Sequence, residues 1–239
     1  MTKPIDHRKH YILVIDIETA NDIENAIAYD LGFVVADRKG NIYETHSLMI
    51  SEIFINHAGL LKSAYYAEKI PSYWKDYAKG ERKMVSIVTA KRMIYDIVKE
   101  YRIKDIFAYN ASFDMNGLNR TLRYLTKSKY RWFFPYGTKI NCIWHMACQT
   151  ILQQKAFFDF AIKNGLVKNG KVSTTAETAY RYICKDNTFA ESHTGLEDVM
   201  IETQILAKCY AQHKPMDTTI RYFCSNLPQR KFKEFQKKT

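Results

Sequence analysis

An apolar run near the N-terminus, Ile12-Leu13-Val14-Ile15, leads directly into two acids, Asp16 and Glu18. The run is continuous rather than alternating, which is typical of a strand covered on both faces. Residues two apart on a strand point to the same face, so the two carboxylates share one side of its end. A divalent cation such as Mg²⁺, which prefers oxygen ligands, would neutralise them. Taken alone, the pair is better explained as exposed acids at a strand end.

The remaining pattern predicts a layered α/β fold. We expect strands over 11–19, 29–36, 42–50 and 106–109, with a hairpin turn at 37–41. Apolar spacing predicts helices between 84 and 101 and over 115–125, 143–154, 157–164, 175–184 and 196–210. Residues 51–82 are irregular and rich in aromatic residues. Strands first, then alternating helix and strand, then helices favour a mixed central β-sheet flanked by helices.

The chain is long enough for one generous domain, since 46% of its 239 residues are apolar. We predict a main domain over 1–213, with an insertion at about 51–82, and a basic extension over 214–239. After Pro228 the extension carries five Lys or Arg residues against a single acid, Glu234. Such a charge run is typical of a solvated tail.

Charge and cysteine usage restrict the class of partner and compartment. The 36 Lys and Arg outweigh the 25 Asp and Glu, giving a formal net charge of +11. This balance favours a polyanionic partner such as nucleic acid and argues against a small cationic substrate. Five widely spaced cysteines without a Cys-x-x-Cys pair indicate free thiols rather than disulfides or structural zinc. With no signal-peptide core and no membrane-length apolar stretch, we expect a cytoplasmic protein.

Two further acidic patterns occur downstream. Asp114 follows the short strand in the segment Asn110-Ala111-Ser112-Phe113-Asp114, where it could also simply cap the next helix. His193 precedes Asp198 by five positions, with Gly195 between them, at the start of the strongest predicted helix. In isolation, Asp198 could be explained by the helix dipole and His193 by solvation on a loop.

Together the three patterns resemble the motifs of the DEDD exonuclease superfamily. These are Asp-x-Glu on the first strand, Asn-x-x-Phe-Asp after a later strand, and His-x₄-Asp opening a late helix. The histidine spacing resembles the DEDDh, or DnaQ-like, branch of 3′-to-5′ exonucleases, and phage-encoded exonucleases most of all. The resemblance spans residues 12–210 and implies a ribonuclease H-like fold for the main domain.

The resemblance also implies roles for individual residues. Asp16, Glu18, Asp114 and Asp198 are expected to hold two Mg²⁺ ions, for which Mn²⁺ can substitute. His193 is expected to take the proton of the attacking water. The product would be a nucleoside 5′-monophosphate, with Thr19 and Ala20 beside the terminal 3′-hydroxyl. Many relatives have Gly where this chain has Ala20, so we expect a slightly narrower terminal-nucleotide site.

Aromatic residues interleaved with bases provide candidates for substrate binding. Tyr66 and Trp74 lie in the insertion among several lysines, a pattern that suits stacking on nucleobases, although a cover helix with core-facing aromatics fits equally well. Asn110 and Phe113 of the second motif are further candidates. The bases between Arg120 and Arg131 could follow a strand backbone, whereas we expect the aromatic run 132–136 to pack in the core.

Alternatives to an exonuclease acting on single-stranded DNA remain open at this stage. The same chemistry could act on RNA 3′ ends or short oligoribonucleotides, because one or two contacts decide recognition of a 2′-hydroxyl. The chain could be a proofreading subunit bound to a replication protein through its basic extension. A non-catalytic nucleic-acid-binding module is disfavoured, because all four acids and the histidine are present. A phage-encoded enzyme would work in the host cytoplasm.

Overall fold

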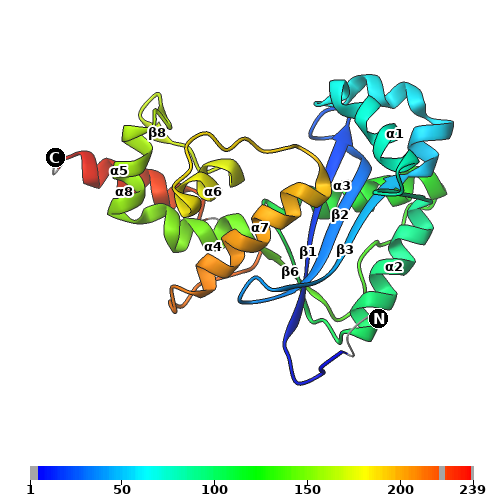
Figure 1. Ribbon diagram of the computed structural model, residues 1–239, viewed down its shortest axis with the longest axis horizontal. Helices are drawn as coiled ribbons and strands as arrows, with labels where there is room; N and C mark the ends of the chain where they lie inside the picture. Colours follow the sequence, from blue (N-terminus) through cyan, green and yellow to red (C-terminus); the bar gives the residue numbers. More distant parts are fainter. Residues whose placement is uncertain (1–4, 221–223, 238–239) are drawn as a thin grey trace.

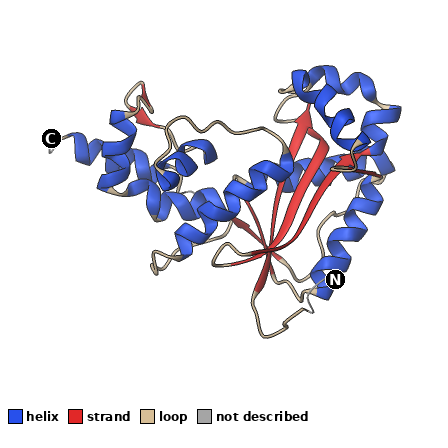
Figure 2. Cartoon of the chain, viewed as in Figure 1, coloured by secondary structure: helices blue, strands red, loops and turns tan. Residues whose placement is uncertain are grey.

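A six-stranded mixed β-sheet forms the centre of the computed structural model, which describes residues 5–220 and 224–237 (Figures 1 and 2). Its strand order is β4-β3-β2-β1-β5-β6. The strands are β1 (Tyr11–Ala20), β2 (Ile27–Asp37), β3 (Ile42–Ile50), β4 (Lys83–Val85), β5 (Asp105–Ala108) and β6 (Lys139–Cys142). The first three are antiparallel neighbours, while β4 runs parallel to β3, β5 to β1, and β6 to β5.

Helices cover both faces of this sheet and form two cores. The first core takes side chains from α1 (Ile70–Ala78), α2 (Ile87–Glu100) and α3 (Ala111–Thr126). The second takes them from α4 (Ile143–Gln149), α5 (Lys155–Lys163), α6 (Ala176–Cys184), α7 (Gly195–Tyr210) and α8 (Asn226–Gln236). Figure 1 shows α5, α6 and α8 gathered beyond α7, beside the small hairpin of β7 (Val167–Lys168) and β8 (Lys171–Val172).

The fold class expected from the sequence is confirmed. An antiparallel β3-β2-β1 unit, extended by parallel β5 and β6 through helical crossovers, is the arrangement of a ribonuclease H-like fold. Strand β1 is covered on both sides, as its continuous apolar run predicted. Ile12 and Val14 belong to the core beneath α7, whereas Leu13 and Ile15 belong to the opposite one.

The insertion is more regular than its sequence predicted. It begins with a π-helical turn, Glu52–Asn56, and two 3₁₀ segments, Ala58–Ser63 and Ala67–Lys69, before α1. Tyr73 on α1 is fully buried, as expected of a cover helix, whereas its neighbour Trp74 is exposed. The following helix also starts later than predicted, because Met84 lies in the edge strand β4.

The prediction of a solvated C-terminal tail is wrong for the described residues. They form α8, in which Pro228 and Phe232 are buried. The Phe232 ring lies 5.3 Å from that of Phe158 on α5, measured between centroids. Apolar residues spaced along one face of a basic helix drive this packing, and the bases stay outside. Lys238 lies outside the described residues, and the boundary near residue 213 stays a prediction.

Two compositional features are visible in the fold. All five cysteines are free thiols, and Cys184 alone among them is exposed. Within residues 5–220 and 224–237, none of the helices combines the length and the apolar character that crossing a bilayer needs.

Candidate active site

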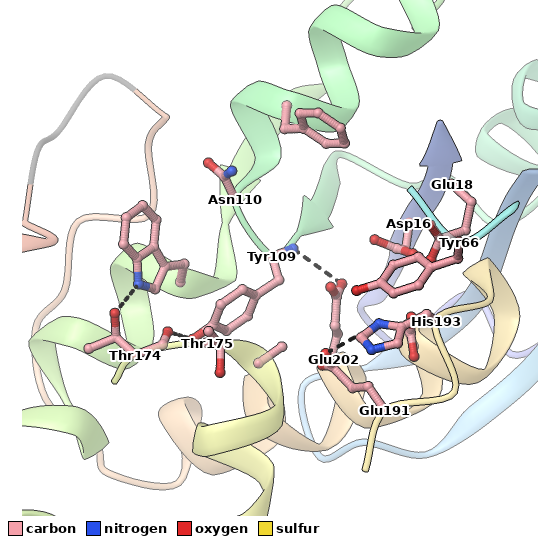
Figure 3. Close-up of a pocket in the computed structure, with 14 residues that line it drawn as sticks. Asp16, Glu18, Tyr66, Tyr109, Asn110, Thr174, Thr175, Glu191, His193 and Glu202 are labelled. Atoms are coloured by element: carbon pink, nitrogen blue, oxygen red, sulfur yellow. Dashed lines mark hydrogen bonds and ion pairs between the residues drawn. The ribbon is translucent and has the colours of Figure 1, made fainter. Parts of the chain in front are cut away.

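The acidic end of β1 opens into a pocket of about 480 Å³ beneath α7 (Figure 3). Asp16 and Glu18 continue the register of Ile12 and Val14, so both carboxylates point toward the α7 side of the sheet. The pairing of β1 with β2 is interrupted by an irregularity between Glu18 and Thr19. This break ends the regular ladder just past the acids.

Helix α7 brings the third acid to the same place. Asp198 lies in the first turn of the helix, and one carboxylate oxygen from each of Asp16, Glu18 and Asp198 can be chosen within 4.8 Å of the others. The hydroxyl of Ser192 lies 3.4 Å from Asp198 Oδ1. Three carboxylates from two elements therefore converge on one point without a cationic side chain lining the described pocket.

His193 lies on the loop that leads into α7, with a left-handed backbone (φ 53°). Its imidazole stacks on the ring of Tyr66, with centroids 4.0 Å apart and planes 9° from parallel. Its Nδ1 lies 3.9 Å from a carboxylate oxygen of Glu191. Both His193 and Tyr66 line the pocket, so the insertion contributes a wall beside the histidine.

Asp114 does not line the pocket, but it lies close enough for its charge to raise the pKa of Asp16 and Glu18. Asn110 adopts a left-handed conformation (φ 60°) that turns the chain from β5 into α3, and Asp114 falls in the first turn of that helix. The Asp114 side chain is 1% exposed, and neither of its oxygens has a hydrogen-bond partner. A buried carboxylate without partners is strongly disfavoured, so a cation bound beside it would remove the penalty.

The pKa values of the acids are raised, because the carboxylates are buried and lie close to one another. Burial, followed by repulsion from Glu202 and Asp114, raises the pKa of Asp16 well above its usual range. Burial raises the pKa of Glu18 to about 8 and that of Asp198 to about 7. Burial raises the pKa of Asp114 to about 8 as well. An all-oxygen, electron-rich donor set of this kind suits Mg²⁺ or Mn²⁺.

Two acids of the pocket, Glu191 and Glu202, were missed by sequence reasoning. Glu202 is 3% exposed, lines the pocket, and accepts a 3.1 Å hydrogen bond from the backbone N–H of Tyr109. It follows Asp198 by four residues on α7, so it shares that helix face. This spacing could have identified it. The hydrogen bond ties α7 to the end of β5, directly before the turn at Asn110.

The other predicted site residues divide into two groups. Tyr66, Asn110 and Phe113 line the pocket. Thr19, Ala20 and Trp74 do not line it; Ala20 is fully buried, so its methyl group does not narrow the pocket. Trp74 packs edge-on against Phe54 instead. The far end of the pocket is lined by residues that sequence reasoning did not single out, namely Tyr109, Trp144, Thr174, Thr175 and Ala176.

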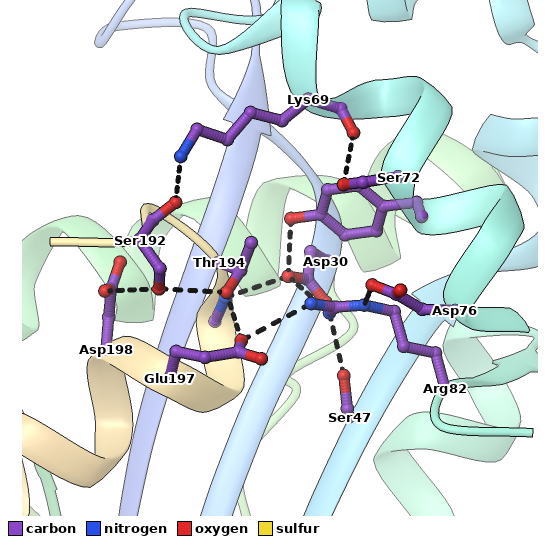
Figure 4. Close-up of polar contacts among 12 residues, drawn as sticks. Asp30, Ser47, Lys69, Ser72, Asp76, Arg82, Ser192, Thr194, Glu197 and Asp198 are labelled. Atoms are coloured by element: carbon purple, nitrogen blue, oxygen red, sulfur yellow. Dashed lines mark hydrogen bonds and ion pairs between the residues drawn. The ribbon is translucent and has the colours of Figure 1, made fainter.

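A buried ionic network supports the start of α7 from below (Figure 4). Asp30 on β2 is fully buried and accepts hydrogen bonds from Tyr73 Oη at 2.8 Å and from the backbone N–H of Gly195 at 2.9 Å. Arg82 lies 3.3 Å from Asp30 and also reaches Asp76 and Glu197, at 3.2 and 3.4 Å. The network links the insertion, the sheet and the helix that carries Asp198.

No protein-family model and no curated protein match the chain. Among solved structures, the chain is similar to the zinc-bound form of an E. coli ExoI complex with single-stranded DNA, at 14% identity and a TM-score of 0.46. The match covers 87% of this chain, which spans only 41% of that one. The assignment of the site therefore rests on its own geometry.

Proposed function

We propose that the chain is a metal-dependent 3′-to-5′ exonuclease of the DEDDh type that releases nucleoside 5′-monophosphates from single-stranded DNA. The observation that carries the proposal is the convergence of Asp16, Glu18 and Asp198 within 4.8 Å in a pocket that also holds His193. The buried, unpartnered Asp114 beside this cluster supports it.

The acids are the proposed holders of the metal. Asp16, Glu18, Asp114 and Asp198 would bind two divalent cations, Mg²⁺ or Mn²⁺, because they offer only carboxylate oxygens and no Lys or Arg side chain lines the described pocket. When bound, such cations supply Lewis-acid stabilisation of the charge that develops on the phosphate and on the leaving 3′-oxygen. The protein contributes the fixed positions of the four carboxylates on β1, α3 and α7.

His193 is the proposed general base. Burial, followed by the nearby Lys69 charge, lowers the pKa of His193, so the imidazole is neutral and able to accept a proton at neutral pH. Stacking on Tyr66 fixes the plane of the ring. The Glu191 carboxylate, 3.9 Å from Nδ1, would stabilise the imidazolium that forms when the ring accepts a proton.

The remaining pocket surface suits one terminal nucleotide. A volume of about 480 Å³ lies in the range of small-ligand sites and is too small for a duplex. Phe113 and Trp144 offer ring surfaces, while Asn110 and Thr174 offer polar groups. The choice of DNA over RNA rests on the resemblance of the motifs to those of phage-encoded exonucleases, and the experiment below tests it.

The test uses a single-stranded DNA oligonucleotide labelled at its 5′ end, with a matched RNA alongside. We expect a Mg²⁺-dependent ladder that shortens from the 3′ end and disappears in EDTA. Asp114→Asn should abolish it, and His193→Ala should slow it by roughly 10²–10⁴-fold. The matched control is His7→Ala, an exposed histidine of the N-terminal segment, which should cut at the wild-type rate.

Three outcomes would count against the proposal. Faster cutting of RNA would replace the DNA substrate with RNA. Internal cuts would overturn the exonuclease assignment. Wild-type protein that cuts neither substrate with Mg²⁺ or Mn²⁺ would leave a nucleic-acid-binding module as the better explanation.

A proofreading role would add a replication-protein partner. The exposed bases of α8, Arg230, Lys231 and Lys233, are the surface on which we would test it. Charge reversal is preferable to deleting the extension, because deletion would remove Phe232 from the core. Loss of polymerase binding with unchanged exonuclease rates would support the partner.

A further inference from the structure

One face of α3 leads away from the pocket toward its C-terminal end. Phe113 lines the pocket, and residues at helical spacing beyond it share its face: Asn116, Arg120, Arg123 and Lys127. From Phe113 to Lys127 this stripe extends roughly 21 Å at about 1.5 Å per residue. A ligand held at the pocket can therefore continue along α3.

The stripe is strongly and one-sidedly basic. Residues 115–158 contain no Asp or Glu, whereas Arg120, Arg123 and Lys127 follow one another along the helix. None of the carboxylates in the described part of the chain forms an ion pair with these three residues. Arg120 and Arg123 instead donate to the carbonyl oxygens of Ala26 and Arg131, at 3.4 and 3.0 Å. Their positive charges remain available to a bound anion.

The surface is hollowed and carries exposed aromatic rings. A groove of about 410 Å³ is lined by Asn116, Asn119, Arg120, Arg123, Tyr124 and Trp132. Tyr124 and Trp132 are each 37% exposed, although Phe133 and Phe134 are buried in the core. The expected core packing of 132–136 thus holds for its middle and not for Trp132 or Tyr136. Lys127 Nζ lies 4.5 Å from the centroid of the Tyr124 ring.

We propose that this surface, the α3 track, binds the single-stranded nucleic acid that extends upstream of the terminal nucleotide. The α3 track comprises Asn116, Arg120, Arg123, Tyr124, Lys127 and Trp132. Its Arg and Lys side chains pair with successive phosphates, and its two aromatic rings stack on unpaired nucleobases. Proteins use this combination to bind single strands without recognising their sequence. The inference rests on the proposed function, because it assumes that the 3′ end occupies the pocket.

The test measures binding in the absence of turnover. In EDTA, a fluorescent single-stranded 20-mer is titrated with wild type and with the triple variant Arg120→Gln, Arg123→Gln, Lys127→Gln. The matched control, Lys99→Gln, Arg102→Gln, Lys104→Gln, removes three exposed charges at the far end of α2. We expect the track variant to bind the 20-mer at least about tenfold more weakly at 0.1 M salt. The slope of log Kd against log salt should fall by about 2, since each phosphate contact contributes about 0.7.

A trinucleotide tests the pocket without the α3 track, because it is too short to reach the Arg and Lys side chains at the far end of α3. Its cleavage by the track variant with Mg²⁺ should stay within twofold of wild type. Equal losses in the track and control variants would reduce the effect to net charge and overturn the proposal, as would unchanged binding of the 20-mer. If wild type binds the 20-mer through the α3 track but never cuts it with metal, the proposed function fails while the track stands. If wild type cuts the 20-mer normally and the track variant binds it as tightly as wild type does, the proposed function stands and the α3 track proposal fails.

Discussion

Gly32 on β2 and Gly195 at the start of α7 lie backbone against backbone. A Cβ atom on Gly32 would lie 2.0 Å from the carbonyl carbon of Gly195, and one on Gly195 would lie 2.6 Å from the Gly32 nitrogen. Gly32 pairs with Asp16 across the β1–β2 ladder, so the contact presses the helix onto the sheet beside that acid. This approach is what brings Asp198 to Asp16 and Glu18.

We expect Gly32→Ala to lower the free energy of unfolding by about 3 kcal/mol, because neither backbone can yield to the added methyl group. Urea denaturation measures the loss. Gly59→Ala is the matched control, since a Cβ at that position meets nothing within 4 Å. Equal stability of the two variants would show that the start of α7 can shift away from β2.

Removing Arg82 should leave a buried charge uncompensated. Arg82 and Asp30 have side chains 4% and 0% exposed, so Arg82→Met should cost about 3–5 kcal/mol of unfolding free energy. Arg8→Met breaks the exposed pair with Asp6 and should change the stability far less, because solvent screens that pair. Adding Asp30→Asn to Arg82→Met should recover part of the loss; a double variant no more stable than the single one would contradict this account.

The metal-free protein should become less stable as pH rises from about 5 to about 8. Burial raises the pKa of Glu18 and of Asp114 to about 8, whereas both titrate near 4 in an unfolded chain. The native state therefore binds more protons in this window, and stability falls as pH increases. Thermal melts in EDTA should show the fall, and millimolar Mg²⁺ should reverse it at pH 8.

Asp114→Asn provides the matching variant for that titration. Its melting temperature in EDTA should depend less on pH than that of wild type, and Mg²⁺ should stabilise it less. Asp96→Asn, which alters an exposed acid on α2, should behave like wild type. Identical pH profiles for Asp114→Asn and wild type would remove Asp114 from the set of coupled acids.

Glu202 should matter for metal affinity more than for folding. Glu202→Gln keeps an oxygen to accept the Tyr109 N–H but removes a negative charge near Asp16. We expect the Mg²⁺ concentration for half-maximal cleavage to rise roughly 10-fold, with little loss of rate at saturation. Glu202→Ala also leaves the N–H of Tyr109 without a hydrogen-bond acceptor, so this variant should lose stability as well. An unchanged Mg²⁺ requirement in Glu202→Gln would make its role purely structural.

Local patterns in the sequence were enough to predict much of the fold. Strands β1 to β3 follow from an apolar run, alternation and a turn signal, all of which depend on neighbours in sequence. Helix α7 follows from its apolar stripes and from the glycine and acids at its start. These segments also carry Asp16, Glu18 and Asp198, which explains why sequence could nominate residues that the structure then brings together.

The parts that escaped prediction depend on partners distant in sequence. The hydrogen bond from Tyr109 to Glu202 and the contact between Gly32 and Gly195 join segments that no local window connects. Similarly, α8 gains its order from burying Phe232 against α5, so its basic composition alone suggested a tail. Trp74 does not line the pocket, because its neighbour Tyr73 occupies the buried face of α1.

The placement of the tryptophans gives the protein optical reporters of its own. Of the three in the chain, Trp144 lines the acidic pocket, Trp132 lines the α3 track, and Trp74 lines neither. Replacing Trp74 and one of the other two by Phe leaves a single indole at either end of the path proposed for the strand. Stopped-flow fluorescence of the two resulting proteins would then time the arrival of a DNA strand at the track and at the pocket separately, without an attached dye.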